Sequence, residues 1–220
     1  MPFLDRADAG RRLAGQLTHL QGTDVAVLGL PRGGIPVAFE VARVLGAPLD
    51  VIVVRKLGLP AQPELAMGAI GEDGVRIINR SVVIGEQVTE AEFMSVEHSE
   101  RIELDRRARR FRGDQPRAPL TGRTAVIVDD GIATGSTALA ACQVARAQGA
   151  TRVVVAVPVA PRSAIPVLAS EADEVVCLEA PDRFMAIGQW YDDFSQTSDE
   201  EVVTLLRRAA MTPLRQSGPP

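Results

Sequence analysis

Apolar residues along this chain fall into short unbroken runs, and stretches with helical spacing separate them. Strands that are apolar on both faces are typical of a buried parallel sheet. The apolar runs predict strands at residues 25–30, 49–54, 124–128, 152–159 and 174–178. The spacing between the runs predicts helices at residues 5–20, 35–45, 134–148, 163–169 and 198–208. This alternation predicts an α/β fold with a central, mostly parallel sheet flanked by helices.

Residues 57–119 break the alternation. A Gly- and Pro-rich loop opens this stretch, and two short apolar runs around residues 72–74 predict a hairpin. A charged helix over residues 89–112 follows, and its acid-before-base pairs four residues apart favour an exposed surface. The arginines of residues 101–112 have two interpretations, a solvated face or a phosphate-binding surface.

Composition narrows the class of protein. The chain has 220 residues, a net charge of −4 and 46% hydrophobic residues, which excludes a disordered chain and disfavours general nucleic-acid binding. Its apolar runs are far shorter than the ~20 residues of a membrane helix, and its charged start lacks a signal segment, so we expect a cytoplasmic protein. We expect one domain over residues 1–212 and a disordered tail at 213–220.

The basic residues are twenty-three arginines and a single lysine, Lys56. Most of this imbalance is a composition bias. Lys56 and Arg55 follow directly on the predicted strand 49–54, at the sheet edge where open α/β folds bind ligands. Lys56 is therefore either a functional residue or a chance survivor of the bias.

The strongest chemical signal is the run Val-Ile-Val-Asp-Asp-Gly-Ile-Ala-Thr-Gly-Ser-Thr at residues 126–137. A buried strand ends in Asp129 and Asp130, a glycine-containing loop follows, and a helix begins at once. Backbone N–H groups at a helix N-terminus bind a phosphate well. Three hydroxyls complete this predicted cradle: Thr134, Ser136 and Thr137.

Two carboxylates beside a phosphate would repel it unless they have another task. They can accept hydrogen bonds from vicinal hydroxyls, with Mg²⁺ nearby. A sugar phosphate meets both demands. The alternative is that Asp129 and Asp130 only cap the following helix.

This run resembles the signature of type I phosphoribosyltransferases, which is apolar residues, two acids, three variable positions and Thr-Gly-x-Thr. Residues 55–60 and 129–135 resemble segments of adenine phosphoribosyltransferases. Residues 181–184, followed by Gly188 and Asp192-Asp193, resemble the hood segment of hypoxanthine-guanine phosphoribosyltransferases. The motifs from Gly29 onward stand in the family's order.

The resemblance implies transfer of a 5-phosphoribosyl group from phosphoribosyl pyrophosphate to a nitrogen acceptor, above all a nucleobase, with release of diphosphate. Asp129 and Asp130 would hold the ribose hydroxyls and the cofactor Mg²⁺. The residues implied for the 5-phosphate are Ala133, Thr134, Gly135, Ser136 and Thr137. Asp129, Asp130 and Lys56 would carry catalysis through positioning and charge. A homodimer is also implied.

The loop Pro31-Arg32-Gly33-Gly34 matches the family's diphosphate loop. Its two glycines permit an unusual backbone, and Arg32 can bind phosphate oxygens with two donors. Taken alone, Arg-Gly-Gly is also compatible with a plain turn. Arg55 and Lys56 are expected as further diphosphate contacts.

The remaining segments of the resemblance are a lid and a hood. Residues 57–119 stand where the family has a flexible lid that excludes water, and residues 179–197 stand where it has the hood. Phe184 is the expected stacking partner of the acceptor. Trp190 and Tyr191, the only Trp and Tyr of the chain, have two interpretations, the same stacking role or packing in the core.

Ala133 stands where hypoxanthine-guanine enzymes carry an Asp that acts near the base nitrogen, so that acid/base role is absent here, as in adenine-type enzymes. Pro158 stands where hypoxanthine-guanine enzymes carry the Lys that reads the exocyclic oxygen, which disfavours recognition of a 6-oxopurine.

A second function class stays open, a regulator that binds phosphoribosyl pyrophosphate or a nucleotide without turnover. The arginines of residues 101–112 favour this reading. The acidic net charge and the lack of a helix-turn-helix pattern weigh against it.

Overall fold

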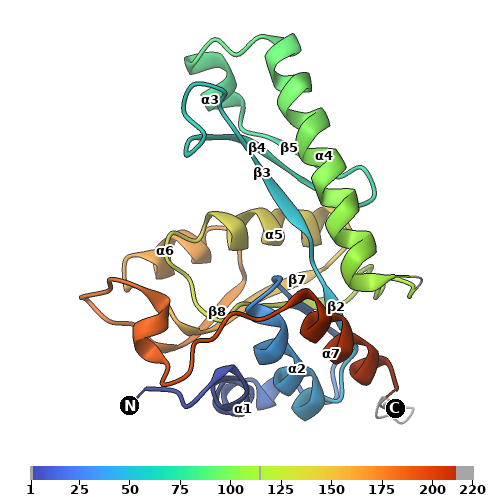
Figure 1. Ribbon diagram of the computed structural model, residues 1–220, viewed down its shortest axis with the longest axis vertical. Helices are drawn as coiled ribbons and strands as arrows, with labels where there is room; N and C mark the ends of the chain where they lie inside the picture. The colour runs from blue at the N-terminus through green and yellow to red at the C-terminus, as the bar shows by residue number, and fades with distance from the viewer. Residues whose placement is uncertain (1, 114, 212–220) are drawn as a thin grey trace.

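A computed structural model describes residues 2–113 and 115–211, so the expected tail at 213–220 lies outside the described residues. Figure 1 shows a core built on a parallel sheet and an insertion that rises from it. The core sheet has the strand order β2-β1-β6-β7-β8, and a second sheet has the order β3-β4-β5.

The five strands of the core sheet run parallel throughout, as the apolar runs predict. Their bounds are β1 Val25–Gly29, β2 Leu49–Val51, β6 Thr124–Val128, β7 Arg152–Val159 and β8 Glu174–Glu179. Every residue of β1 is buried, because helices cover both faces of the sheet. The carboxyl ends of β1 and β6 are in register, with Gly29 opposite Val128, so the loops after both strands emerge side by side.

Each face of the core sheet has its own hydrophobic cluster. Ala125 and Ile127 of β6 pack on one face with α5 (Ser136–Ala147) and α6 (Ala164–Ala169). Val126 and Val128 point to the other face, toward α1 (Arg6–Gln16) and α2 (Gly34–Leu45). Figure 1 shows the two helix layers on opposite sides of the sheet. Because successive side chains of a strand point to opposite faces of the sheet, β6 contributes residues to both hydrophobic clusters.

The expected single strand at residues 49–54 is wrong. The chain leaves the parallel sheet after Val51 and enters the second sheet at Val54, where β3 (Val54–Gly58) begins. Arg55 and Lys56 therefore lie inside β3, opposite Ile70 and Ala69 of an antiparallel neighbour, and not at the end of a core strand. The apolar run continues through the break, so hydrophobicity alone could not reveal the change of sheet.

The insertion is a folded unit. Its remaining elements are β4 (Ala66–Gly71), β5 (Arg76–Ile78), α3 (Arg80–Gly85), which the pattern did not predict, and α4 (Glu90–Arg112). A capping box formed by Thr89 and Glu92 begins α4. Buried Leu57, Met67 and Leu104 join one apolar cluster with α2, β2 and the last helix, α7 (Asp199–Met211).

A buried charge network fastens the insertion to the core. The Nε of Arg112 donates to Asp50 Oδ1 at 3.0 Å, and its Nη2 donates to the carbonyl oxygen of Val51 at 2.9 Å. A third bond joins Nη1 to Glu72, in the turn between β4 and β5. The three side chains are 8–10% exposed, so the ends of α4, β2 and β4 meet at one arginine.

The segment after β8 returns to the start of the chain. It contains a short 3₁₀ helix, η2 (Ile187–Trp190), and Tyr191 forms a bridge with Phe3. Those two rings lie 5.3 Å apart between centroids. Among the described residues, no helix has the length and apolarity needed to cross a membrane.

Candidate active site

The turn between β6 and α5 carries the acidic pair and the hydroxyl loop. Gly135 precedes α5 with a φ of +83°, a left-handed conformation that glycine adopts without strain. Thr134, Ser136 and Thr137 are exposed around the start of the helix, and the hydroxyl oxygens of Thr134 and Ser136 lie 3.4 Å apart. The hydroxyls and the helix N-terminus are therefore both accessible to an anion from solvent.

The diglycine loop lies directly against the acidic pair. A Cβ on Gly33 would come within 2.0 Å of the Asp130 carboxylate oxygen, and a Cβ on Gly34 within 2.6 Å of the Val128 carbonyl oxygen. Only glycine permits this approach. Two motifs that are about a hundred residues apart in sequence thus form one surface, because their parent strands β1 and β6 are neighbours.

Asp130 is held by a residue that the sequence reasoning missed. The Nε of Arg6, the first residue of α1, donates to Asp130 Oδ2 at 2.8 Å, and both side chains are 12% exposed. Arg6 also donates to the Ser195 carbonyl oxygen at 2.6 Å and stacks over the Phe194 ring at 4.0 Å. No local pattern could have signalled a pair 124 positions apart.

The main chain of Asp130 has a second anchor in Tyr191. The Tyr191 hydroxyl donates to the Asp130 carbonyl oxygen at 2.5 Å. Burial raises the pKa of Tyr191, and the negative charge of Asp130 raises it further, so the phenol stays protonated and able to donate. The expected hood therefore contacts the acidic pair through Tyr191.

Asp129 differs from its neighbour: its Oδ1 accepts from the backbone N–H of Asp130 at 2.9 Å, and it forms no ion pair within the described residues. Burial raises the pKa of Asp129 well above its usual value, and the adjacent Asp130 charge adds to this effect. A cation beside Asp129 would favour the ionised carboxylate and so oppose this rise in pKa. The described residues contain no group of three or more His, Cys, Asp or Glu that could enclose a metal ion. Mg²⁺ commonly uses only one or two carboxylates together with substrate phosphates, so the donor set fits it.

Lys56, Arg55 and Thr137 line one cavity of about 300 Å³ beside the diglycine loop. The Arg55 guanidinium contacts Glu100 of α4 at 2.5 Å. The Nζ of Lys56 lies 3.2 Å from Glu64, whose side chain is 93% exposed. The structure thus places Lys56 and Arg55 near the phosphate cradle, although they arrive from the insertion.

The Arg32 side chain takes another direction. It lies 3.6 Å from Asp199 at the start of α7 and lines a separate cavity of about 420 Å³. Its neighbours Gly33 and Gly34 remain against the acidic pair. In this structure the loop faces the site with its backbone, while its arginine points toward α4 and α7.

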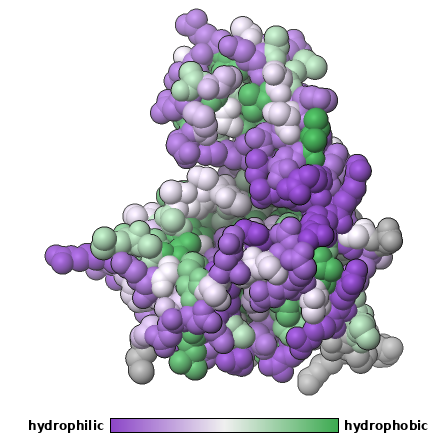
Figure 2. All heavy atoms as spheres, in the orientation of Figure 1, coloured by the Kyte–Doolittle hydropathy of each residue, from purple (hydrophilic) through white to green (hydrophobic). Residues whose placement is uncertain are grey.

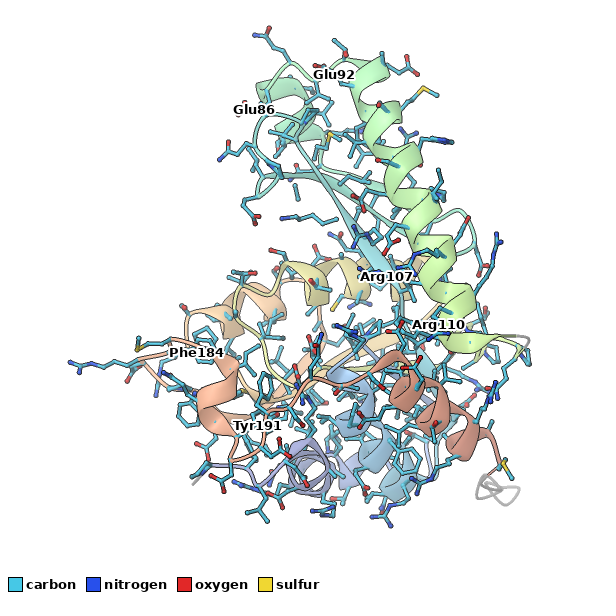
Figure 3. The ribbon with its side chains drawn as sticks, in the orientation of Figure 1. Glu86, Glu92, Arg107, Arg110, Phe184 and Tyr191 are labelled. Carbon is cyan, nitrogen blue, oxygen red and sulfur yellow. The ribbon has the colours of Figure 1, made fainter. Side chains whose placement is uncertain are left out.

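The segment containing Phe184 contacts the acidic turn through Ile187. Ile187 packs so closely on Gly131 that a Cβ there would lie 2.6 Å from the Ile187 side chain. Phe184 stands three residues earlier and is half-buried. Figure 3 labels Phe184 and Tyr191 on the segment that follows β8.

Comparisons with known proteins identify the family of this chain. A family model for the phosphoribosyl transferase domain matches residues 4–194. Two Mycobacterium tuberculosis proteins, from strains CDC 1551 and H37Rv and both named "Putative phosphoribosyl transferase", are 63% identical over 207 residues, which is 94% of this chain. The crystal structure of TT1426 from Thermus thermophilus superposes with a TM-score of 0.88 at 44% identity, covering 94% of this chain and 99% of TT1426.

The chain spans about half the length of the curated relatives it matches, since the alignment covers 47% of each mycobacterial protein.

Proposed function

The chain belongs to the phosphoribosyl transferase domain family, and from that premise we propose that it transfers a 5-phosphoribosyl group from phosphoribosyl pyrophosphate to a nitrogen acceptor. The observation that carries the proposal is the contact between Gly33 and the Asp130 carboxylate, beside the open cradle at α5. In this proposal, Gly33 and Gly34 form the diphosphate surface. The two acids for the ribose lie next to them, and the phosphate cradle follows at the start of α5.

In this proposal each part of the donor has its own residues. The 5-phosphate lies at the N-terminus of α5 against Thr134, Ser136 and Thr137, with the backbone of Ala133 and Gly135. Asp129 and Asp130 accept hydrogen bonds from the ribose hydroxyls. Backbone groups of Gly33 and Gly34, together with Lys56 and Arg55, face the diphosphate.

Mg²⁺ would be held by Asp129 and Asp130 together with the donor's own oxygens. When bound, it neutralises negative charge on the diphosphate leaving group. The protein's contribution is to keep Asp130 oriented through Arg6 and Tyr191. Burial of Asp129 beside Asp130 supports cation binding at this place, because a cation would offset the repulsion between the two carboxylates.

In the reaction, the bond from the anomeric carbon to the diphosphate oxygen breaks. A bond from the same carbon to the acceptor nitrogen forms, with inversion. Lys56 stabilises the charge that develops on the diphosphate. The proton of the acceptor nitrogen leaves to solvent, and no side-chain nucleophile is needed.

We place the acceptor, a nucleobase, near Phe184 in a hood over residues 179–197. The insertion at 57–119 acts as the lid that keeps water from the reacting carbon. The half-buried ring and the packing of Ile187 on Gly131 support the acceptor placement. Lys56 lies in β3 of the insertion and lines the cavity beside the diglycine loop, so the insertion borders the proposed site. This supports its assignment as the lid.

The test is diphosphate release from phosphoribosyl pyrophosphate with Mg²⁺ and a panel of purines, pyrimidines and small amines. We expect acceptor-dependent release with at least one nucleobase. Tight binding of the donor without release for any acceptor would contradict the transferase and favour the regulator instead.

A further inference from the structure

The cavity beside the diglycine loop is lined by one of the arginines of residues 101–112, for which the sequence leaves a solvated face and a phosphate-binding surface open. Arg107 of α4 lines this cavity together with Lys56 and Thr137. Figure 3 labels Arg107 on the stretch of α4 next to the core, whereas Glu92 lies at the far end of the same helix. We propose that Arg107 binds the diphosphate of the donor, an assignment that rests on the proposed function.

The first argument is that the three cations that line the cavity differ in how many of their donor groups already face a carboxylate. Arg55 has both its Nε and its Nη2 within 2.5 Å of Glu100, so its fork already faces a carboxylate. Lys56 has a single charged donor group. Within the part of the chain that the structure describes, Arg107 has one ion pair, from Nε to Glu103 Oε1 at 2.6 Å. Its two terminal nitrogens remain able to donate to phosphate oxygens.

The second argument is the local charge. Glu103 accepts from both Arg106 and Arg107, so one carboxylate serves two guanidinium groups and leaves an excess of one positive charge. The bonds from Arg106 and then Arg107 lower the pKa of Glu103 to about 2, which keeps this carboxylate ionised at neutral pH. The pair holds Arg107 by its Nε and does not cancel the cationic character of the turn.

The third argument is position. Arg107 and Pro31 line both the cavity beside the diglycine loop and the neighbouring cavity of about 420 Å³. The other charged residues of the second cavity are Arg32, Arg106, Arg110 and Asp199. Figure 2 shows a continuous hydrophilic surface over this part of α4 and the core next to it. Arg107 thus stands at the border between the diglycine loop and an arginine-rich surface that would attract a highly charged anion.

Arg106 supplies a matched control. It carries the same charge one residue away and pairs with the same Glu103, yet it lines the second cavity and not the first. A general electrostatic effect would weaken R106Q and R107Q alike. A direct contact would weaken R107Q more than R106Q, because only R107Q would lose a charged hydrogen bond to the ligand.

The experiment is calorimetric titration of inorganic diphosphate and of phosphoribosyl pyrophosphate, each with Mg²⁺, into the wild type, R107Q, R107K and R106Q. We expect R107Q to bind both ligands about tenfold more weakly or worse, because a charged hydrogen bond is lost. R107K should lie between R107Q and wild type, and R106Q should stay within about twofold of wild type. Melting temperatures of all four proteins verify folding.

Equal affinities of R107Q and wild type, or equal losses in R106Q and R107Q, would overturn the assignment of Arg107 and leave the proposed function intact. A wild-type protein that binds neither ligand would contradict the proposed function itself, and the assignment with it.

Discussion

The turn after β6 and the insertion face the same cavity, but they are held in place by different means. In the turn, Asp129 and Asp130 follow a buried central strand, and their position is set by main-chain pairing of β6 with β1 and β7. In the insertion, Arg55 and Lys56 lie on an antiparallel sheet that meets the core through side chains. These are the apolar cluster around Leu57, the packing of Val54, Val75 and Ile77 on the core cluster, and the charge network of Arg112.

Because of this difference, we expect donor binding and closure of the insertion to depend on different regions of the molecule. A site on a central parallel strand cannot shift without disturbing the sheet, so the acidic pair is pre-organised. The β3-β4-β5 sheet meets the core through side-chain contacts, so a change in its distance from the core costs less free energy. We therefore expect substitutions in the turn to act on donor affinity, and substitutions at the base of the insertion to act on stability and on closure.

The largest expected effect on stability is at Arg112. Replacing it with glutamine leaves Asp50 and Glu72 buried without their cation, which should lower the free energy of unfolding by about 3–5 kcal/mol. Chemical denaturation measures the loss. R109Q removes an exposed arginine from the same turn of α4 and should cost less than about 0.5 kcal/mol. A similarly small change in R112Q would show that the insertion does not depend on this network.

A second expected effect is at Arg6, which orients Asp130 without being expected to contact the donor. R6Q should weaken donor binding by about tenfold, since the Asp130 carboxylate loses its buried partner. The control is R11Q, on the exposed side of the same helix. Because R6Q also leaves a buried charge, binding is compared at a temperature where its unfolding curve shows a folded protein. Unchanged affinity in folded R6Q would exclude a positioning role.

Substitutions at Lys56 test whether turnover needs only its positive charge or also the shape of its ammonium group. K56R keeps the charge but replaces a compact ammonium with a planar fork, and we expect turnover to fall by about tenfold. K56A should fall further. Steady-state diphosphate release measures both variants. Full activity of K56R would assign the lone lysine to the composition bias of the chain.

The smallest expected effect is a gain in stability from D129N. The pKa of Asp129 is raised in the folded protein, so its contribution to stability is present below the ordinary Asp pKa and is lost as pH rises through the raised value. D129N cannot ionise and should melt about 2–4 °C higher than wild type at pH 7, corresponding to about 1 kcal/mol. The difference should shrink toward pH 4.

D105N, at an exposed acid on α4, is the control for this effect and should melt within about 1 °C of wild type at both pH values. A D129N variant that melts below wild type at pH 7 would show that the carboxylate has a stabilising partner in the folded protein.

The turn after β6 could be predicted from sequence because its determinants are local. An apolar run, two acids, a left-handed Gly135 and a helix stand in consecutive positions, and parallel strands fix where such a turn emerges. The diglycine loop was predictable for the same reason, although its contact with Asp130 needed the pairing of β1 with β6.

Other features depend on partners far along the chain. Arg6 and Tyr191 reach Asp130 from the two ends of the chain, and neither has a neighbouring signal. The change of sheet between Val51 and Val54 occurs inside one apolar run. The helix face that carries Arg107 has the ion-pair spacing of a solvated helix, and only its tertiary position relates it to the cavity.

The central claim is that Asp129 and Asp130 bind the ribose of the donor. Titration of phosphoribosyl pyrophosphate with Mg²⁺ into wild type and the double variant D129N/D130N tests this claim most directly. We predict saturable binding to wild type and at least about 100-fold weaker binding to a double variant that still unfolds cooperatively. Equal affinity in the two proteins would contradict the assignment of Asp129 and Asp130.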